Sequence, residues 1–227
     1  MSYLLLIIFL IVTTGIYIFW RFFWFFRNPE RKIPDGNNIV SPADGTVVYV
    51  KKVINGDVPI SIKNKKEIKI EEILGNNLIN TKNPYFIIGI FMHPSSVHVN
   101  RAPISGTIKK ISYTEGRNSP MTMMWWRVLL GKRPYELYSK HIITNERNVV
   151  LIDGNVKVAV VQIADIYVKK IECWVKENDI INKGQRIGMI KMGSQVDLIF
   201  PYDLKFNILV KEGEKVKAGE TILVKIN

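Results

Sequence analysis

The chain has 227 residues, enough for one well-buried core, and 47% of them are apolar. Cys173 is the single cysteine, which excludes an intrachain disulfide and a cysteine-based metal site. The net charge of +12 favours an anionic partner, but zinc-finger spacing and a recognition-helix signal are missing, so we expect no nucleic-acid partner and no metal.

The first recognisable segment, residues 3–20, carries no charged residue and is rich in Leu, Ile and Phe. It has about the length that a helix needs to cross the hydrocarbon layer. Arg21 follows, and then an aromatic cluster at residues 22–26 that is typical of a membrane interface. A cleaved signal peptide is the alternative, but a basic start and small cleavage-site residues are not seen. We predict a membrane anchor over residues 1–26.

Basic residues follow this segment at Arg27, Arg31 and Lys32. Positive charge flanking a membrane helix tends to stay on the cytoplasmic side. We therefore expect a protein of the cell membrane whose remaining part, residues 27–227, faces the cytoplasm. Attraction to anionic lipid headgroups then accounts for the net positive charge.

Short apolar runs rich in β-branched residues follow, separated by Gly, Asn, Asp and Pro. Such runs predict strands. One short helix is expected at residues 71–74, so the fold class is mainly β (α+β). The expected strands lie at residues 47–50, 85–92, 149–152, 156–163 and 171–175.

Two segments, residues 175–184 and 210–219, resemble each other. Each has a strand end, an acidic turn, an apolar residue and a final glycine. The pattern is similar to the hairpin turns of biotinyl/lipoyl-type barrel-sandwich domains, which have two related halves. Shared turn chemistry alone is the other explanation, because Gly, Asn and Asp are what such turns require. We predict a structural repeat.

Residues 120–126 read Pro-Met-Thr-Met-Met-Trp-Trp, with basic residues on either side at Arg117, Arg127, Lys132 and Arg133. One interpretation is a helix or loop that covers the core. The other is a second membrane contact, since Met and Trp suit an apolar, adaptable interface.

The pair Gly193-Ser194 lies between two strand-like runs, within residues 191–198 (Lys-Met-Gly-Ser-Gln-Val-Asp-Leu). Alone it would indicate a turn. It occurs together with five other short motifs in a fixed order along the chain. The six motifs lie at residues 26–31, 41–45 (Ser-Pro-Ala-Asp-Gly), 98–106, 145–148, 162–164 and 193–198.

In order and spacing, these motifs resemble the phosphatidylserine decarboxylase family, in its compact prokaryotic and archaeal form. The resemblance implies self-cleavage between Gly193 and Ser194 into fragments 1–193 and 194–227, which stay associated. The Ser194 hydroxyl would attack the Gly193 carbonyl, and elimination from the resulting ester would leave a pyruvoyl group. Glycine suits this position because it permits close approach and unusual dihedrals.

The activity implied is the decarboxylation of phosphatidylserine, or archaetidylserine, to the ethanolamine phospholipid. Losing carbon dioxide from an amino acid requires an electron sink that side chains lack and a carbonyl cofactor supplies. A pyruvoyl group derived from Ser194 meets that need without a metal. A membrane anchor fits a phospholipid substrate that stays in the bilayer.

The resemblance also implies the catalytic partners. Asp44 would support self-cleavage through a histidine in an Asp-His-Ser arrangement, although Asp before Gly45 is also a common turn residue. His98 matches the histidine, which passes protons near neutral pH. His93 is the reserve candidate and His141 is the remaining histidine.

Asn100 and Arg101 are candidate ligands of the substrate headgroup, because a guanidinium matches phosphate or carboxylate geometry. An ion pair with an acid at the core edge is the alternative for Arg101. Larger family members carry a second histidine at this position. Asp165 is another departure, since relatives tend to have glycine there, and residues 145–148 are expected to fix a turn near the site.

Two other functions remain open. A non-catalytic, membrane-tethered lipoyl-like carrier would need a modifiable lysine at a hairpin tip, and Lys191 is the candidate. A degenerate family member would no longer process itself. The decarboxylase predicts two fragments on a denaturing gel, and the carrier predicts one band.

Overall fold

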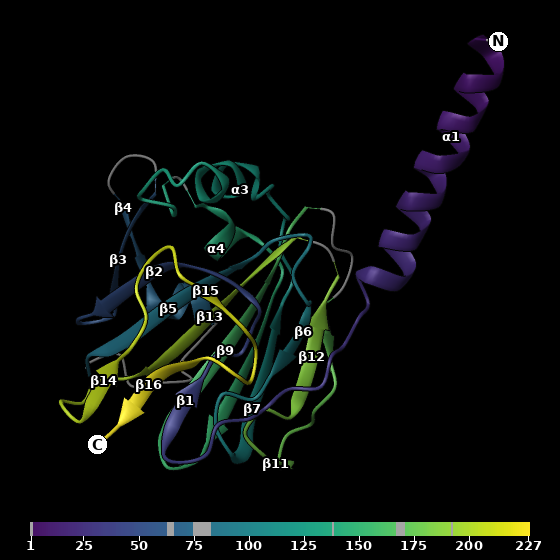
Figure 1. Cartoon of the computed structure of the whole chain (residues 1–227). Helices are drawn as coiled ribbons and strands as arrows, with labels where there is room; N and C mark the ends of the chain where they lie inside the picture. The colour runs from purple at the N-terminus through teal and green to yellow at the C-terminus, as the bar shows by residue number, and fades with distance from the viewer. Residues whose placement is uncertain (1, 63–65, 75–82, 138, 167–170, 192) are drawn as a thin grey trace.

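The computed structural model describes residues 2–62, 66–74, 83–137, 139–166, 171–191 and 193–227. A β-rich domain carries an N-terminal helix that projects away from it (Figure 1). Helix α1 (Ser2–Phe19) continues into a π-helical turn, η1 (Trp20–Trp24). Together they hold a 22-residue span, Tyr3–Trp24, with a mean hydropathy of 2.3 and no part buried in the protein. The span is long and apolar enough to cross a membrane, although a signal sequence would have the same properties.

The domain is built on an eight-stranded antiparallel sheet with the order β11-β7-β8-β9-β13-β5-β2-β15. The expected strands at residues 47–50, 85–92 and 149–152 fall in β2, β5 and β8, and these predictions are confirmed. The expected strand at residues 156–163 matches β9 except at its first residue, and the one at residues 171–175 is shorter, since β10 ends at Cys173. The strands of this sheet are β2 (Gly45–Val53), β5 (Tyr85–Met92), β7 (Gly106–Thr114), β8 (Arg147–Asp153), β9 (Lys157–Ala164), β11 (Ile180–Ile181), β13 (Ser194–Pro201) and β15 (Lys215–Val216).

Smaller elements cover the two faces of this sheet. One face packs against two three-stranded sheets, and the other against a hairpin and short helices. The three-stranded sheets are β1 (Asn38–Val40), β16 (Ile222–Ile226) and β14 (Phe206–Ile208), and β10 (Ile171–Cys173), β12 (Arg186–Ile190) and β6 (Val99–Arg101). The other layer holds β3 (Asp57–Ile62), β4 (Lys66–Lys69), α2 (Ile70–Leu74), α3 (Thr122–Leu129) and α4 (His141–Thr144).

Strand β13 is buried on both faces because the sheet is covered on both sides. Leu198 packs into the core beneath the three-stranded sheets, and Ile199 into the core beneath the helices. Successive side chains of a strand point to opposite faces, so Ser194 shares the face of Leu198, and Gln195 lies on the other. The start of this strand therefore lies deep between the layers.

The two similar segments of the sequence supply the two edge strands of the large sheet. Ile181 in β11 lies opposite Gly106 at the start of β7, and Val216 in β15 lies opposite Gly45 at the start of β2. At each edge of the sheet, a two-residue strand thus pairs with the start of a long strand, and these two edges lie at opposite ends of the strand order.

The N-terminal segment contacts the domain at Phe25, directly after η1. This side chain is fully buried, unlike the exposed aromatic residues before it, and its ring lies 4.3 Å from that of His98. The following segment crosses strands β6 and β12, where Arg101 donates to Asn28 Oδ1 and the Pro29 carbonyl. We call residues 25–31 the strap.

Helix α3 combines the two interpretations of residues 120–126. Met121 and Met124 are buried in the core, which confirms that one side of the segment covers the sheet. Met123 and Trp126 point outward and are 57% and 50% exposed, so this apolar surface has no cover within the protein.

Candidate functional site

The Gly193-Ser194 peptide lies at the start of β13, between two neighbouring strands. Ser194 pairs with Met92 of β5 on one side and with Ala164 of β9 on the other. Its side chain is fully buried, and its hydroxyl lies 3.3 Å from the Met92 sulfur. Met192, the residue before this pair, lies outside the described residues. The serine is thus held in place by the sheet and shielded from water.

Gly193 has the left-handed backbone that only glycine adopts easily, with φ of +45°. Its carbonyl oxygen accepts a hydrogen bond of 3.2 Å from the backbone N–H of Asp165. A β-carbon at position 193 would lie 2.6 Å from Asp165 Oδ2. Both the dihedral and the lack of space explain why glycine precedes the serine.

The side chain of Asp165 is fixed against this peptide. Oδ1 accepts hydrogen bonds from the backbone N–H of Met121 at 3.0 Å and from that of Ile166 at 2.6 Å. Burial raises the pKa of its carboxyl group above the ordinary value, and the two hydrogen bonds oppose that rise. Asp165 therefore touches the peptide bond that is expected to break.

His98 is fully buried, directly before β6. Its Nδ1 lies 2.9 Å from the carbonyl oxygen of Ser96, which can only accept, so Nδ1 carries the proton. Nε2 has no hydrogen-bond partner among the described residues. Desolvation, with smaller contributions from Arg27 and His93, lowers the pKa to about 4. The ring is therefore neutral at pH 7 and holds a free lone pair, as a general base requires.

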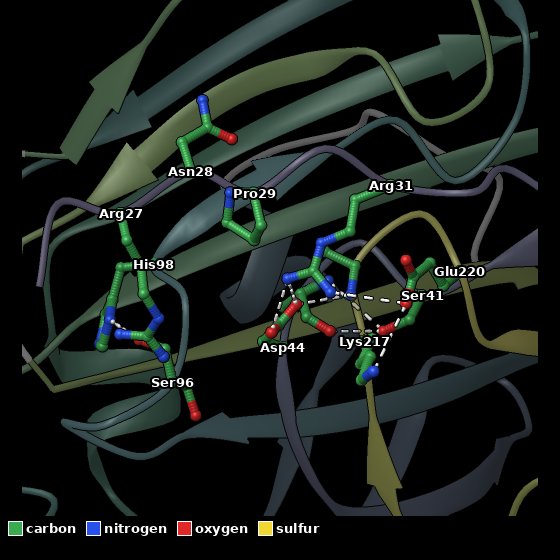
Figure 2. A network of polar contacts seen from close by, with 12 residues as sticks. Arg27, Asn28, Pro29, Arg31, Ser41, Asp44, Ser96, His98, Lys217 and Glu220 are labelled. Carbon is green, nitrogen blue, oxygen red and sulfur yellow. Dashed lines mark hydrogen bonds and ion pairs between the residues drawn. The ribbon is translucent and has the colours of Figure 1, made fainter. Parts of the chain in front are cut away.

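Asp44 lies in a separate polar cluster (Figure 2). One terminal nitrogen of Arg31 contacts both of its carboxylate oxygens, at 2.9 and 2.8 Å, and the Ala218 N–H donates to Oδ1 at 2.8 Å. Arg31 also lies 3.6 Å from a carboxylate oxygen of Glu220. The structure thus brings Asp44 to the strap, and no hydrogen bond joins it to His98 in this state.

Asn100 belongs to a buried chain of amides that leads to the serine. Asn148 donates to Gln162, and Gln162 donates to Asn100 Oδ1, each at 2.8 Å. Asn100 Nδ2 lies 3.6 Å from the Met92 sulfur, the same atom that the Ser194 hydroxyl contacts. Asn100 is therefore close enough to affect the serine, although sequence alone suggested a headgroup ligand.

Arg101 is buried, and its guanidinium is used within the protein. In addition to its two contacts with the strap, it donates to the Gly184 carbonyl at 2.9 Å. In this state its role is to hold the N-terminal segment against β6 and β12.

A second buried polar network, which was not predicted from the sequence, lies on the opposite face of the sheet. Gln195 donates to Tyr49 Oη and to Asp197 Oδ1, each at 2.7 Å, and pairs with His141 Nε2 at 3.0 Å. Burial raises the pKa of Asp197 to about 7 and lowers that of His141 to about 4. The sequence feature that could have indicated this network is the pair Gln195 and Asp197, two polar residues on one face of a strand that is buried on both sides. The network fixes β13 directly after Ser194.

The motif at residues 145–148 fixes the turn that was expected. Asn145 donates to the carbonyl oxygens of Ser119 and Ala164, at 2.8 and 2.7 Å, and accepts from the Ser119 N–H at 2.7 Å. It thus ties the end of β9 to the segment before α3, on either side of the Asp165 contact with Gly193.

A cleft of about 510 Å³ opens between α3 and the β15 edge. Its lining mixes apolar, basic, acidic and imidazole groups, including His93, Val128, Leu129, Lys215 and Asp44. Burial and nearby Lys215 lower the pKa of His93. Within the described parts of the chain, no three His, Cys, Asp or Glu side chains cluster in a way that could hold a metal ion.

Comparison with known proteins shows consistent similarity. Residues 18–224 match the family model described as phosphatidylserine decarboxylase. A putative archaetidylserine decarboxylase proenzyme of Methanocaldococcus jannaschii is 41% identical over 209 residues, which cover 88% of this chain and 87% of that protein. Phosphatidylserine decarboxylase proenzymes of Syntrophus aciditrophicus and Desulfotalea psychrophila are 38% and 35% identical, over 88% and 89% of this chain and 77% and 78% of theirs.

Proposed function

Because this chain belongs to the phosphatidylserine decarboxylase family, we propose that it removes the carboxyl group of a seryl phospholipid after cutting itself between Gly193 and Ser194. The observation that carries the proposal is the geometry of this peptide. A fully buried serine hydroxyl follows a glycine with φ of +45°, whose carbonyl oxygen is held by a backbone N–H. The proenzyme names of the relatives support cleavage of a precursor.

Ser194 is the residue that would yield the pyruvoyl group. Its surroundings fit such a group, because the sheet holds the residue on both sides and the burial excludes water. The group supplies the carbonyl that binds the substrate amine and accepts the electrons released with carbon dioxide. Neither the chemistry nor the residues around Ser194 call for a metal.

His98 moves protons in this proposal. The neutral ring and its unpartnered Nε2 suit it to accept a proton during self-cleavage and to return one to the substrate carbon. Asp44 supports self-cleavage, as the family resemblance implies, once its carboxylate is released from Arg31. The reserve candidate His93 lines the cleft and is placed to meet the substrate instead.

The substrate would enter through the cleft beside α3. Lys215 and His93 offer positive or hydrogen-bonding groups to a phosphodiester, and Val128 and Leu129 offer apolar surface to acyl chains. The exposed side of α3 would rest on the bilayer, and residues 1–26 would anchor the protein there. Basic residues after the anchor favour a position of residues 27–227 at the cytoplasmic face. Asn100 and Arg101 would reach the headgroup only after the strap moves.

The two halves of the domain would form a barrel-sandwich repeat of the lipoyl-like kind. Support comes from the equivalent pairing of the two edge strands, β11 with β7 and β15 with β2. Each repeated segment also ends in a glycine of nearly the same φ, +80° at Gly184 and +76° at Gly219. The repeat explains the fold, and the decarboxylase chemistry is added at β13.

Intact mass measurement under denaturing conditions tests the proposal. The purified protein should contain one fragment that ends at Gly193 and one that begins with a pyruvoyl group derived from Ser194. The variant Ser194→Ala should stay full length, whereas the control Ser112→Ala, on the half-exposed strand β7, should mature normally. Wild-type protein that decarboxylates phosphatidylserine while still uncleaved would overturn the proposal. A single inactive species would indicate a family member that no longer processes itself.

A further inference from the structure

Asp165 touches the Gly193-Ser194 peptide through two different groups. Its backbone N–H donates to the Gly193 carbonyl oxygen at 3.2 Å, and its Oδ2 lies against the place that a β-carbon of Gly193 would fill. Its Oδ1 is tied to the N–H groups of Met121 and Ile166. The residue thus joins the start of α3, the end of β9 and the start of β13.

We propose that Asp165 is a positioning residue for self-cleavage: its backbone N–H stabilises the charge that develops on the Gly193 oxygen, and its side chain fixes that N–H in place. This inference rests on the proposed cleavage between Gly193 and Ser194. It gives a role to the position where the chain departs from the family pattern.

The chemical step needs such a donor. When the Ser194 oxygen bonds to the Gly193 carbonyl carbon, the carbonyl electrons move onto the oxygen and make it negative. The hydroxyl proton leaves through a base and ends on the Ser194 nitrogen as the carbon–nitrogen bond breaks. A backbone N–H aimed at the oxygen lowers the barrier, because its hydrogen bond strengthens as the charge grows. The N–H of Asp165 already points at this oxygen before the reaction.

The side chain explains why that N–H stays aligned. Residue 165 is the first residue beyond β9, so the sheet ladder no longer fixes it. Its Oδ1 replaces the ladder with two hydrogen bonds, one of them to Met121, which is buried in the core. A neutral amide could make the same bonds without placing a negative charge near the developing oxyanion. Asparagine should therefore substitute for aspartate, whereas alanine should not.

Cell-free translation of the full chain in detergent micelles, followed by denaturing gels over time, gives the half-time of precursor cleavage. Asp165→Ala should lengthen it by about 10- to 100-fold, the cost expected when a reacting group loses its alignment. Asp165→Asn should cleave as fast as the wild type or faster. Asp153→Ala, which removes a half-exposed aspartate at the end of β8, is the matched control and should not change the rate.

Hydroxylamine, which cleaves esters, shows which step is slow. If Asp165→Ala fails to form the ester, added hydroxylamine should not release fragments from its precursor. Rapid release would show that the ester forms normally and would overturn the inference, as would wild-type cleavage by Asp165→Ala. Equal slowing of the Asn and Ala variants would also overturn it. Wild-type protein that stays uncleaved would instead refute the proposed function.

Discussion

The contact between Arg31 and Asp44 leads to a prediction that separates a structural role of Asp44 from a chemical one. The side chains are 6% and 15% exposed, and the bond between them closes the strap over the edge of the domain. We consider Arg31→Met, Asp44→Ala and the double variant. Each single change leaves one charge of the pair without its main partner.

The expected loss follows from burial. Removing one partner of a buried ion pair costs about 3–5 kcal/mol. Glu220 remains 3.6 Å from Arg31, and Asp44 is partly exposed, so we expect about 2–3 kcal/mol for either single variant. In a domain of this size that lowers the melting temperature by roughly 4–12 °C. The double variant should lose less than the sum of the two, because the pair is then removed as a unit.

Melting temperatures in detergent and cleavage half-times are the two measurements. If Asp44 takes part in proton handling, Asp44→Ala should accumulate precursor, whereas Arg31→Met, at a similar loss of stability, should still cleave. Equal cleavage defects in the two variants would refute this reasoning, and would show that Asp44 acts only through Arg31. If the stability losses of Arg31→Met and Asp44→Ala add up fully in the double variant, the estimated interaction between Arg31 and Asp44 is wrong.

Three further predictions concern the base, the cut and the membrane. The pKa of His98 is lowered from 6.5 to about 4, so cleavage measured against pH should stay constant from pH 7 to about 5 and fall as the pH drops through about 4. Because the unfolded chain binds this proton already below about pH 6.5 and the folded chain only near pH 4, the free energy of unfolding should decrease as the pH falls from about 6.5 to about 4. Gly193→Ala should slow cleavage on gels at least about tenfold, since the left-handed backbone costs roughly 1–2 kcal/mol with a β-carbon and the clash with Asp165 adds to it. A Gly193→Ala variant that matures normally would contradict this. With α1 deleted but Phe25 kept, the protein should bind anionic vesicles in sedimentation assays at low salt and dissociate from them at high salt. In this truncated protein, Trp126→Ala should weaken binding about tenfold. The control Tyr113→Ala, which removes an exposed aromatic residue on β7, should not weaken it.

The strands could be predicted from the sequence because they depend on local patterns, whereas the cut was implied by the resemblance of six motifs to a known family. Runs of β-branched residues indicate strands wherever they lie, and the Gly-Ser pair was identified between two such runs. Contacts across the fold could not be predicted in this way. Asp44 meets Arg31 only because the strap folds back, and Asp165 meets Gly193 only because β9 and β13 are neighbours in the sheet.

Phe25 illustrates the same limit. Its sequence neighbours are exposed aromatic residues, and composition alone groups it with them at the membrane border. In the structure it is the one of residues 22–26 that turns inward, and its ring lies against that of His98, tilted by 31°. The direction of a single side chain depends on the π-helical turn before it, and no compositional pattern records that turn.

The position of the cut has a consequence for the lifetime of the enzyme. Strand β13 pairs with β5 along its whole length and with β9 from Ser194 to Ile199. A break before Ser194 would therefore leave the two fragments held together by the hydrogen bonds of the sheet. Segments 1–193 and 194–227 made separately could assemble in the same way, but the serine would then have no acyl bond to attack. By the proposed mechanism, the cofactor would therefore be produced only once in each molecule. A molecule whose pyruvoyl group has been chemically modified would keep its fold and its place in the membrane but lose its activity. Only synthesis of a new chain would restore that activity.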